Sequence, residues 1–144
     1  MDNLNILRKL DDLSNFRRAI SRSLNTSALH LSINKTQKQV LMAILRTTEN
    51  NMTDLSEQIG LEKSTLTRTV DSLIEEGLVT RSPGIQDRRT ITCALTEKGQ
   101  AIANQLDQLM RDHLESILSG LSENERIELN EKLSDCIRLM KSQG

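Results

Sequence analysis

The sequence is almost devoid of aromatic residues: Phe16 is its single aromatic side chain among 144 residues, and Trp and Tyr are absent. The core must therefore be aliphatic, and a ligand pocket cannot rely on stacking between several rings. Two cysteines, Cys93 and Cys136, are too few for a disulfide framework. No apolar run approaches the roughly 18 residues that span a bilayer, and the N-terminus does not resemble a secretory signal. These absences favour a cytoplasmic protein without a membrane segment.

The motifs of common catalytic and metal sites are missing as well. The sequence has no phosphate-binding glycine-rich loop, no nucleophile elbow and no His-Glu-x-x-His. His30 and His113 have no carboxylate or cysteine at metal-ligand spacing, which leaves only a zinc site assembled from scattered residues. A small buried hydrophobe is the simpler interpretation of Cys136, because a redox switch needs an exposed, activated thiolate. We expect no enzyme, no cofactor and no metal.

Positive and negative charges nearly cancel, with a formal net charge of −1. The acidic excess lies at the C-terminal end, where residues 100–144 contain five basic and eight acidic side chains. Residues 35–99 contain nine of each. A DNA-binding surface in this middle segment must therefore gather its basic groups on one side.

Hydrophobic spacing predicts long amphipathic helices at both ends of the chain. Apolar residues three and four apart predict one helix over about residues 3–29. Two more are expected after Thr96, separated by a break at Gly120. Both ends of the chain thus carry apolar stripes, which suggests that a partner chain covers them. The alternative is that the terminal helices pack against each other within one chain. The side chains expected in a shared core are Phe16, Ile20, Leu114, Leu118, Leu133 and Ile137.

Three shorter helices and a hairpin are predicted between these ends. Asn34 with Gln37 matches a capping box that opens the first helix, and Thr53 is placed to cap the second. The third covers about residues 63–76 and ends at Gly77. The two strands expected beyond it are residues 78–81 and 90–95.

This order describes a winged helix-turn-helix, so the expected fold class is mainly α with a small β-hairpin wing (α+β). The last helix of such a trio enters the major groove, where hydroxyls and Arg68 can bond to base edges. An ordinary solvated helix face is the simpler interpretation of these residues taken alone. The side chains predicted to face outward are Ser64, Thr65, Arg68, Asp71 and Ser72, with Thr67 to one side.

The hairpin tip strengthens the DNA-binding interpretation. Arg88 and Arg89 are adjacent there, and a protruding arginine fits the negative potential of a narrow minor groove. Asp87 and Arg89 would lie on the same side of an extended strand, so we expect an ion pair between them. A merely polar hairpin tip is the alternative.

At this point the residues resemble the MarR family of transcription regulators. The run from Asp54 to Arg81 is similar to the family's helix-turn-helix, and Asp87 to Gly99 matches its wing signature of Asp-x-Arg followed by Leu-Thr-x-x-Gly. One departure is Glu62, where many members have a serine able to cap the recognition helix. The motif resemblance covers about residues 34–99.

The resemblance implies an obligate homodimer that binds a pseudo-palindromic operator of double-stranded DNA, usually as a repressor. It places base reading on the recognition helix, the minor-groove contact on Arg89, and the support of that arginine on Asp87. A small-molecule effector is also implied, in a crevice that Arg17, His30 and Ile33 could line. The full predicted DNA-binding set is Lys63, Ser64, Thr65, Thr67, Arg68, Asp87, Arg88 and Arg89.

The sequence thus predicts a regulator in three parts: residues 1–33 and 97–144 for dimerisation, and residues 34–96 for DNA binding. The alternative is a winged-helix interaction module that no longer reads DNA. Arg68, Arg88 and Arg89 argue against that alternative, because a module without DNA would have no reason to retain all three.

Overall fold

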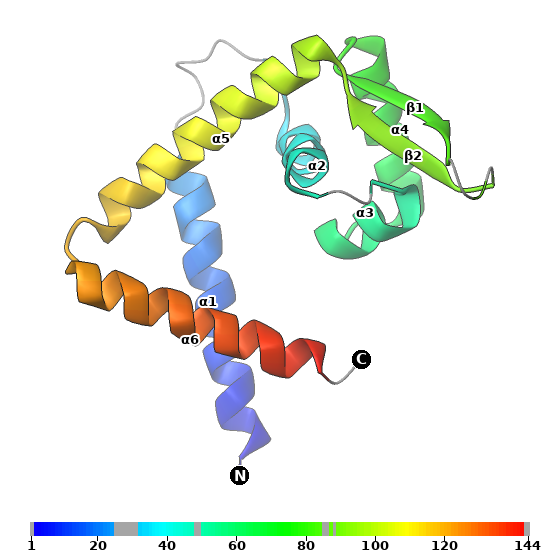
Figure 1. Ribbon diagram of the computed structural model, residues 1–144. Coiled ribbons are helices and arrows are strands. Elements are labelled where there is room, and N and C mark those ends of the chain that lie inside the picture. Colours follow the sequence, from blue (N-terminus) through cyan, green and yellow to red (C-terminus); the bar gives the residue numbers. More distant parts are fainter. Residues whose placement is uncertain (1, 25–31, 48–49, 85–86, 88, 143–144) are drawn as a thin grey trace. The chain divides into compact units, whose positions relative to one another are not determined.

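The computed structural model describes residues 2–24, 32–47, 50–84, 87 and 89–142. Contacts group the chain into two compact units, residues 25–109 and residues 1–24 with 110–144. Figure 1 shows the elements in chain order. They are α1 (Asn3–Ser23), α2 (Lys35–Arg46), α3 (Met52–Ile59), α4 (Lys63–Glu75), β1 (Val79–Pro83), β2 (Ile91–Leu95), α5 (Glu97–Leu118) and α6 (Glu123–Lys141). The predicted mainly helical fold with a two-stranded wing is confirmed.

The unit of residues 25–109 is built on an aliphatic core. Helices α2, α3 and α4 contact one another, and the hairpin packs against all three. One apolar side of each helix supplies the buried residues, as the spacing predicts. The cluster consists of Val40, Leu41, Ile44, Leu55, Leu66, Val70, Leu73, Leu78, Val79, Cys93 and Leu106.

Helix ends follow the local sequence signals closely. The predicted capping box is present, with the Asn34 side chain accepting from the Gln37 backbone and the Gln37 side chain accepting from Asn34. The expectation that Thr53 caps the next helix is wrong: Asn51 is the N-cap, and its Oδ1 accepts from the Asp54 backbone at 2.8 Å. Asparagine is the stronger N-cap residue, so the helix starts two residues earlier.

The antiparallel hairpin pairs Val79 with Leu95 at its base and Pro83 with Ile91 toward its tip. Pro83 is tolerated because β1 is an edge strand, which needs no donor on its open side. On the other side of the sheet, β2 is tied to the chain before α3: the Cys93 backbone N–H donates to the Asn50 carbonyl at 2.8 Å. The wing is thereby joined to the helical core along its inner strand.

The junction between α4, the hairpin and α5 is unusually tight. The Thr96 hydroxyl donates to the Gly77 carbonyl at 2.6 Å and accepts from the Gly99 backbone N–H at 3.0 Å. The Thr96 backbone N–H donates to the Leu78 carbonyl at 3.0 Å. Gly77 has a φ of 75°, a conformation that favours glycine and ends α4.

The unit containing both chain ends differs in leaving its apolar side chains uncovered. No side chain of α1 or α6 is buried. Phe16 is 60% exposed and Ile137 is 55% exposed. His113 on α5 holds the end of α1, since its Nε2 lies 3.0 Å from the Ile20 carbonyl and 2.7 Å from the Ser23 hydroxyl.

The first helix is shorter than predicted. It ends at Ser23, with Leu24 as its C-cap, and the remaining residues of the expected span lie outside the described part of the chain. None of the helices formed by the described residues combines the length and apolar character that a membrane crossing requires.

Gly99 offers a direct test of the junction. A Cβ added there would lie 1.9 Å from the Leu78 carbonyl oxygen, and a backbone oxygen cannot move aside as a flexible side chain could. We expect Gly99→Ala to lower the free energy of unfolding by about 1–3 kcal/mol, measured by urea denaturation. Gly120→Ala is the matched control, because a Cβ there meets nothing within 4 Å. It should stay within about 1 kcal/mol of wild type, and equal effects of both substitutions would contradict the packing described.

Candidate nucleic-acid interface

The recognition helix α4 presents a polar outer side. Lys63, Ser64, Thr67 and Arg68 are exposed near its N-terminus, while Leu66 and the apolar residues one and two turns later are buried. The Thr67 hydroxyl donates to the Lys63 carbonyl at 2.8 Å, which leaves its lone pairs free to accept. Two long cationic side chains flanking two short hydroxyls can reach both phosphates and base edges.

Two residues predicted to face outward are only partly exposed. Thr65 and Ser72 are half-buried, because Thr69, which the apolar pattern missed, is buried beside them. A buried hydroxyl must be satisfied, and Thr69 donates to the Thr65 carbonyl within the helix at 2.8 Å. The outer side is therefore narrower than predicted and is centred on Ser64, Thr67 and Arg68.

Asp71 and Arg81 link the recognition helix to the wing. The Arg81 guanidinium lies 2.7 Å from the Asp71 carboxylate, and both side chains are partly exposed. Arg81 also lines a depression of about 180 Å³ with Met52, Thr53, Lys63, Leu66, Thr67 and Ile91. Sequence reasoning did not select Arg81. The available signal was its place on the first strand of the wing, close to an acidic residue on the helix before it.

The wing loop positions Arg89 through Asp87. One carboxylate oxygen of Asp87 accepts from the Arg89 backbone N–H at 3.0 Å and lies 3.4 Å from the Arg89 Nε. The expected ion pair is thus present, but a turn creates it and not an extended strand: the Thr90 N–H donates to the Asp87 carbonyl at 3.0 Å. The Arg89 side chain is 94% exposed. Arg88, the other predicted wing contact, lies outside the described residues.

The start of α4 has no side-chain cap. Glu62 is the N-cap residue and makes no capping hydrogen bond, as its departure from the family's serine suggests. The first backbone N–H groups of the helix therefore have no acceptor in that side chain. They lie at the positive end of the helix dipole. The same end carries Lys63, whose charge offsets that of Glu62.

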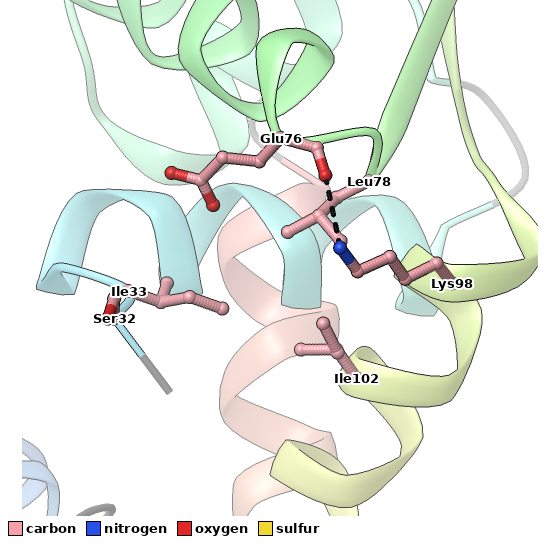
Figure 2. Close-up of a pocket in the computed structure, with 6 residues that line it drawn as sticks. All are labelled: Ser32, Ile33, Glu76, Leu78, Lys98 and Ile102. Atoms are coloured by element: carbon pink, nitrogen blue, oxygen red, sulfur yellow. Dashed lines mark hydrogen bonds between the residues drawn. The ribbon is translucent and has the colours of Figure 1, made fainter. Parts of the chain in front are cut away.

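Of the predicted effector residues, only Ile33 lies beside a described pocket. This pocket has a volume of about 310 Å³ and is lined by Ser32, Ile33, Glu76, Leu78, Lys98 and Ile102. Figure 2 shows the Lys98 amine directed at the Glu76 backbone carbonyl, 3.5 Å away, above an aliphatic floor. Arg17 belongs to the other unit, and His30 lies outside the described residues.

The two cysteines differ in environment. Cys93 is buried, and that burial raises the pKa of its thiol although the Arg81 charge acts in the opposite direction. Its Sγ lies 3.5 Å from the Met52 sulfur. Cys136 is exposed in the single chain, so the expectation that it is buried there is wrong. Within the described residues, no three His, Cys, Asp or Glu side chains are grouped so that they could hold a metal ion.

Comparisons with known proteins agree on one family. Residues 33–91 match the family model described as MarR family. The structure of a MarR family protein from Bacillus stearothermophilus has a TM-score of 0.76 at 21% identity, covering 98% of this chain and 99% of that one. The Multiple Antibiotic Resistance Repressor, MarR, has a TM-score of 0.71 at 28% identity, covering 90% and 94%. A mutant of MarR from E. coli complexed with operator DNA has a TM-score of 0.69 at 28% identity, covering 94% and 99%.

Proposed function

Since this chain is a winged-helix protein of the MarR family, we propose that it is a homodimeric, sequence-specific DNA-binding regulator that acts in the cytoplasm as a repressor. The observation that carries the proposal is the combination of an exposed hydroxyl-rich and cationic side on α4 with a freely protruding wing arginine. In this proposal residues 34–96 bind DNA and residues 1–33 and 97–144 form the dimer.

The DNA contacts divide by chemistry. Arg68 is long enough to bind guanine bidentately in the major groove, and Ser64, Thr65 and Thr67 make shorter contacts to base edges or phosphates. Lys63 at the helix start binds a phosphate. Arg89 enters the minor groove with Asp87 holding its base, and the adjacent Arg88 contacts the backbone or groove edge. Repression follows because a protein bound at an operator excludes other proteins from the same DNA.

Arg89→Ala tests the DNA-binding part. We expect affinity for the promoter fragment of its own gene to fall about 5- to 100-fold, because a minor-groove contact is worth roughly 1–3 kcal/mol. Fluorescence anisotropy at fixed salt measures this, and wild-type affinity should decrease steeply as salt is raised. Arg138→Ala removes the same charge from an exposed position on α6 and should change affinity by less than about twofold.

A wild-type protein that shows no binding at low salt, either to that fragment or to fragments selected from its genome, would contradict the regulator proposal. The winged-helix interaction module without DNA binding would then be the better interpretation. If wild type binds but Arg89→Ala binds equally well, the family assignment stands and the minor-groove role of Arg89 is wrong.

The dimer part is supported by the uncovered apolar side of the terminal helices. Leu129, Leu133, Cys136, Ile137 and Met140 fall on one side of α6 by helical spacing, and all are exposed in the single chain. Large exposed apolar patches mark interaction sites in soluble proteins. A two-fold dimer would space two recognition helices about 34 Å apart, one turn of DNA, as a pseudo-palindromic operator requires.

Ile137→Lys tests the dimer. A charge within a shared apolar core is costly to bury, so we expect a shift from dimer to monomer in sedimentation equilibrium and a loss of operator binding. Asn124→Lys adds the same charge at an exposed position of α6 that helical spacing places opposite that side, and it should remain dimeric. A wild type that is monomeric at micromolar concentration would contradict this part alone.

The effector part is supported by the pocket beside Ile33, whose aliphatic side chains lie next to the Lys98 amine and to Glu76 and suit a small, largely apolar molecule with a polar group. We expect a small-molecule screen in the anisotropy assay to yield a compound that weakens wild-type operator binding. Ile102→Phe, which fills the pocket, should bind DNA normally and lose the response. A compound that acts equally on both proteins would place the effector site elsewhere.

A further inference from the structure

Gln37 is a buried polar side chain at the point where α2 meets α4. It is 5% exposed, although it occupies the first turn of a surface helix and its amide carries two donors and an acceptor. Burying an amide is unfavourable unless its hydrogen bonds are made within the protein. Its partners therefore explain its position, and they lie on two different helices.

The two ends of the Gln37 amide point to different elements. The Oε1 atom accepts from the Asn34 backbone N–H at 3.0 Å, which completes the capping box. The Nε2 atom donates to the Ser72 hydroxyl at 3.0 Å and to the Glu76 carboxylate at 3.3 Å. The Asn34 N–H can only donate, so the oxygen must face it and the NH₂ group must face α4.

The two partners lie on α4 and at its end, and Ser72 is itself held in place. Ser72 donates its hydroxyl proton to the Thr69 carbonyl at 2.7 Å, so it can only accept from Gln37. Glu76 is the C-cap residue of α4 and lies four residues, about one turn, after Ser72. Two directional bonds one turn apart fix both the rotation of a helix and its position along its own axis.

The aliphatic core shared by α2 and α4 does not supply that constraint. Its members include Leu41, Val70 and Leu73, and hydrophobic contact is non-directional. Aliphatic cores tolerate small shifts when volume is preserved, and they lose uniqueness before they lose stability. The Gln37 amide thus adds to this helix pair two directional hydrogen bonds that the aliphatic contacts cannot replace.

We infer that Gln37 is a positioning residue that sets the orientation of the base-reading side of α4, and this inference rests on the proposed DNA-binding function. A helix with its side chains has a radius of about 5–6 Å, so a rotation of about 20° moves a side-chain tip by about 2 Å. That displacement breaks a hydrogen bond of ordinary length. Hydrogen bonding of Ser64, Thr67 and Arg68 to base edges is therefore sensitive to a small rotation of α4, whereas electrostatic attraction to phosphates is not.

The test compares specific with non-specific binding. Gln37→Met keeps the approximate volume and removes both bonds to α4, and Ser72→Ala removes one of them while leaving the capping box intact. Gln39→Met, at an exposed position of the same helix, is the matched control. Each variant is titrated with an operator fragment and with a random duplex of equal length at the same salt, at a temperature where circular dichroism shows it fully folded.

We expect Gln37→Met to reduce operator affinity about tenfold or more, a loss of roughly 1–3 kcal/mol of base discrimination, with random-duplex affinity within about twofold of wild type. Ser72→Ala should lower the ratio of operator affinity to random-duplex affinity by a smaller factor, and Gln39→Met should leave this ratio unchanged. In ¹⁵N–¹H spectra of the free proteins, the amide signals of residues 63–68 should shift in the first two variants only.

An unchanged ratio of specific to non-specific affinity in a folded Gln37→Met protein would overturn the inference. The role of Gln37 would then be limited to capping α2. If Gln37→Met fails to fold, Ser72→Ala decides, because it preserves the cap. If wild type itself does not prefer its operator, the proposed function fails, and the amide signals of α4 alone decide whether Gln37 orients the helix.

Discussion

The hydroxyl of Thr96 closes the unit of residues 25–109, and the position of the wing on that unit depends on this one group. It donates to the carbonyl of Gly77, where α4 ends, and accepts from Gly99 in the first turn of α5. The chain leaves α4, forms the whole hairpin and returns to within hydrogen-bonding distance of its starting point. The absent Cβ of Gly99 makes this possible, because α5 passes directly over the Leu78 carbonyl. The Leu-Thr-x-x-Gly part of the wing signature therefore has a physical cause: it fixes the base of the wing, and the base fixes where Arg89 protrudes.

Sequence reasoning succeeded where the signal is local. The capping box predicted at Asn34 is present, and Gly77, predicted to end α4, has the left-handed conformation that favours glycine. It failed where two local signals compete or where tertiary contacts decide. Asn51 and Thr53 are both plausible caps, and only the stronger one is used. Thr69 lies on the inner side of α4 by helical spacing, but it is polar, and the internal hydrogen bond that allows its burial is not part of a hydrophobic pattern.

The candidate interface shows the same division. The exposed positions of Ser64, Thr67 and Arg68 follow from helical spacing, and the link between Asp87 and Arg89 follows from their types and proximity. The geometry of that link does not, because a turn replaces the expected strand. Gln37 was identified only as half of a capping box. Its second role is to bind Ser72 and Glu76. These residues follow it by 35 and 39 positions in the chain, so a single sequence carries no signature of the contact.

A protein with a net charge of −1 cannot obtain DNA affinity from a broadly basic surface. Its attraction to phosphates is limited to a few placed cations, so a larger share of any preference for an operator must come from base contacts. Base contacts depend on orientation to within an ångström or two, whereas phosphate contacts tolerate error. A nearly neutral DNA-binding protein therefore needs a more rigidly oriented recognition helix than a strongly basic protein does. A directional, fully satisfied amide buried between α2 and α4 meets that need in a way that an aliphatic core cannot.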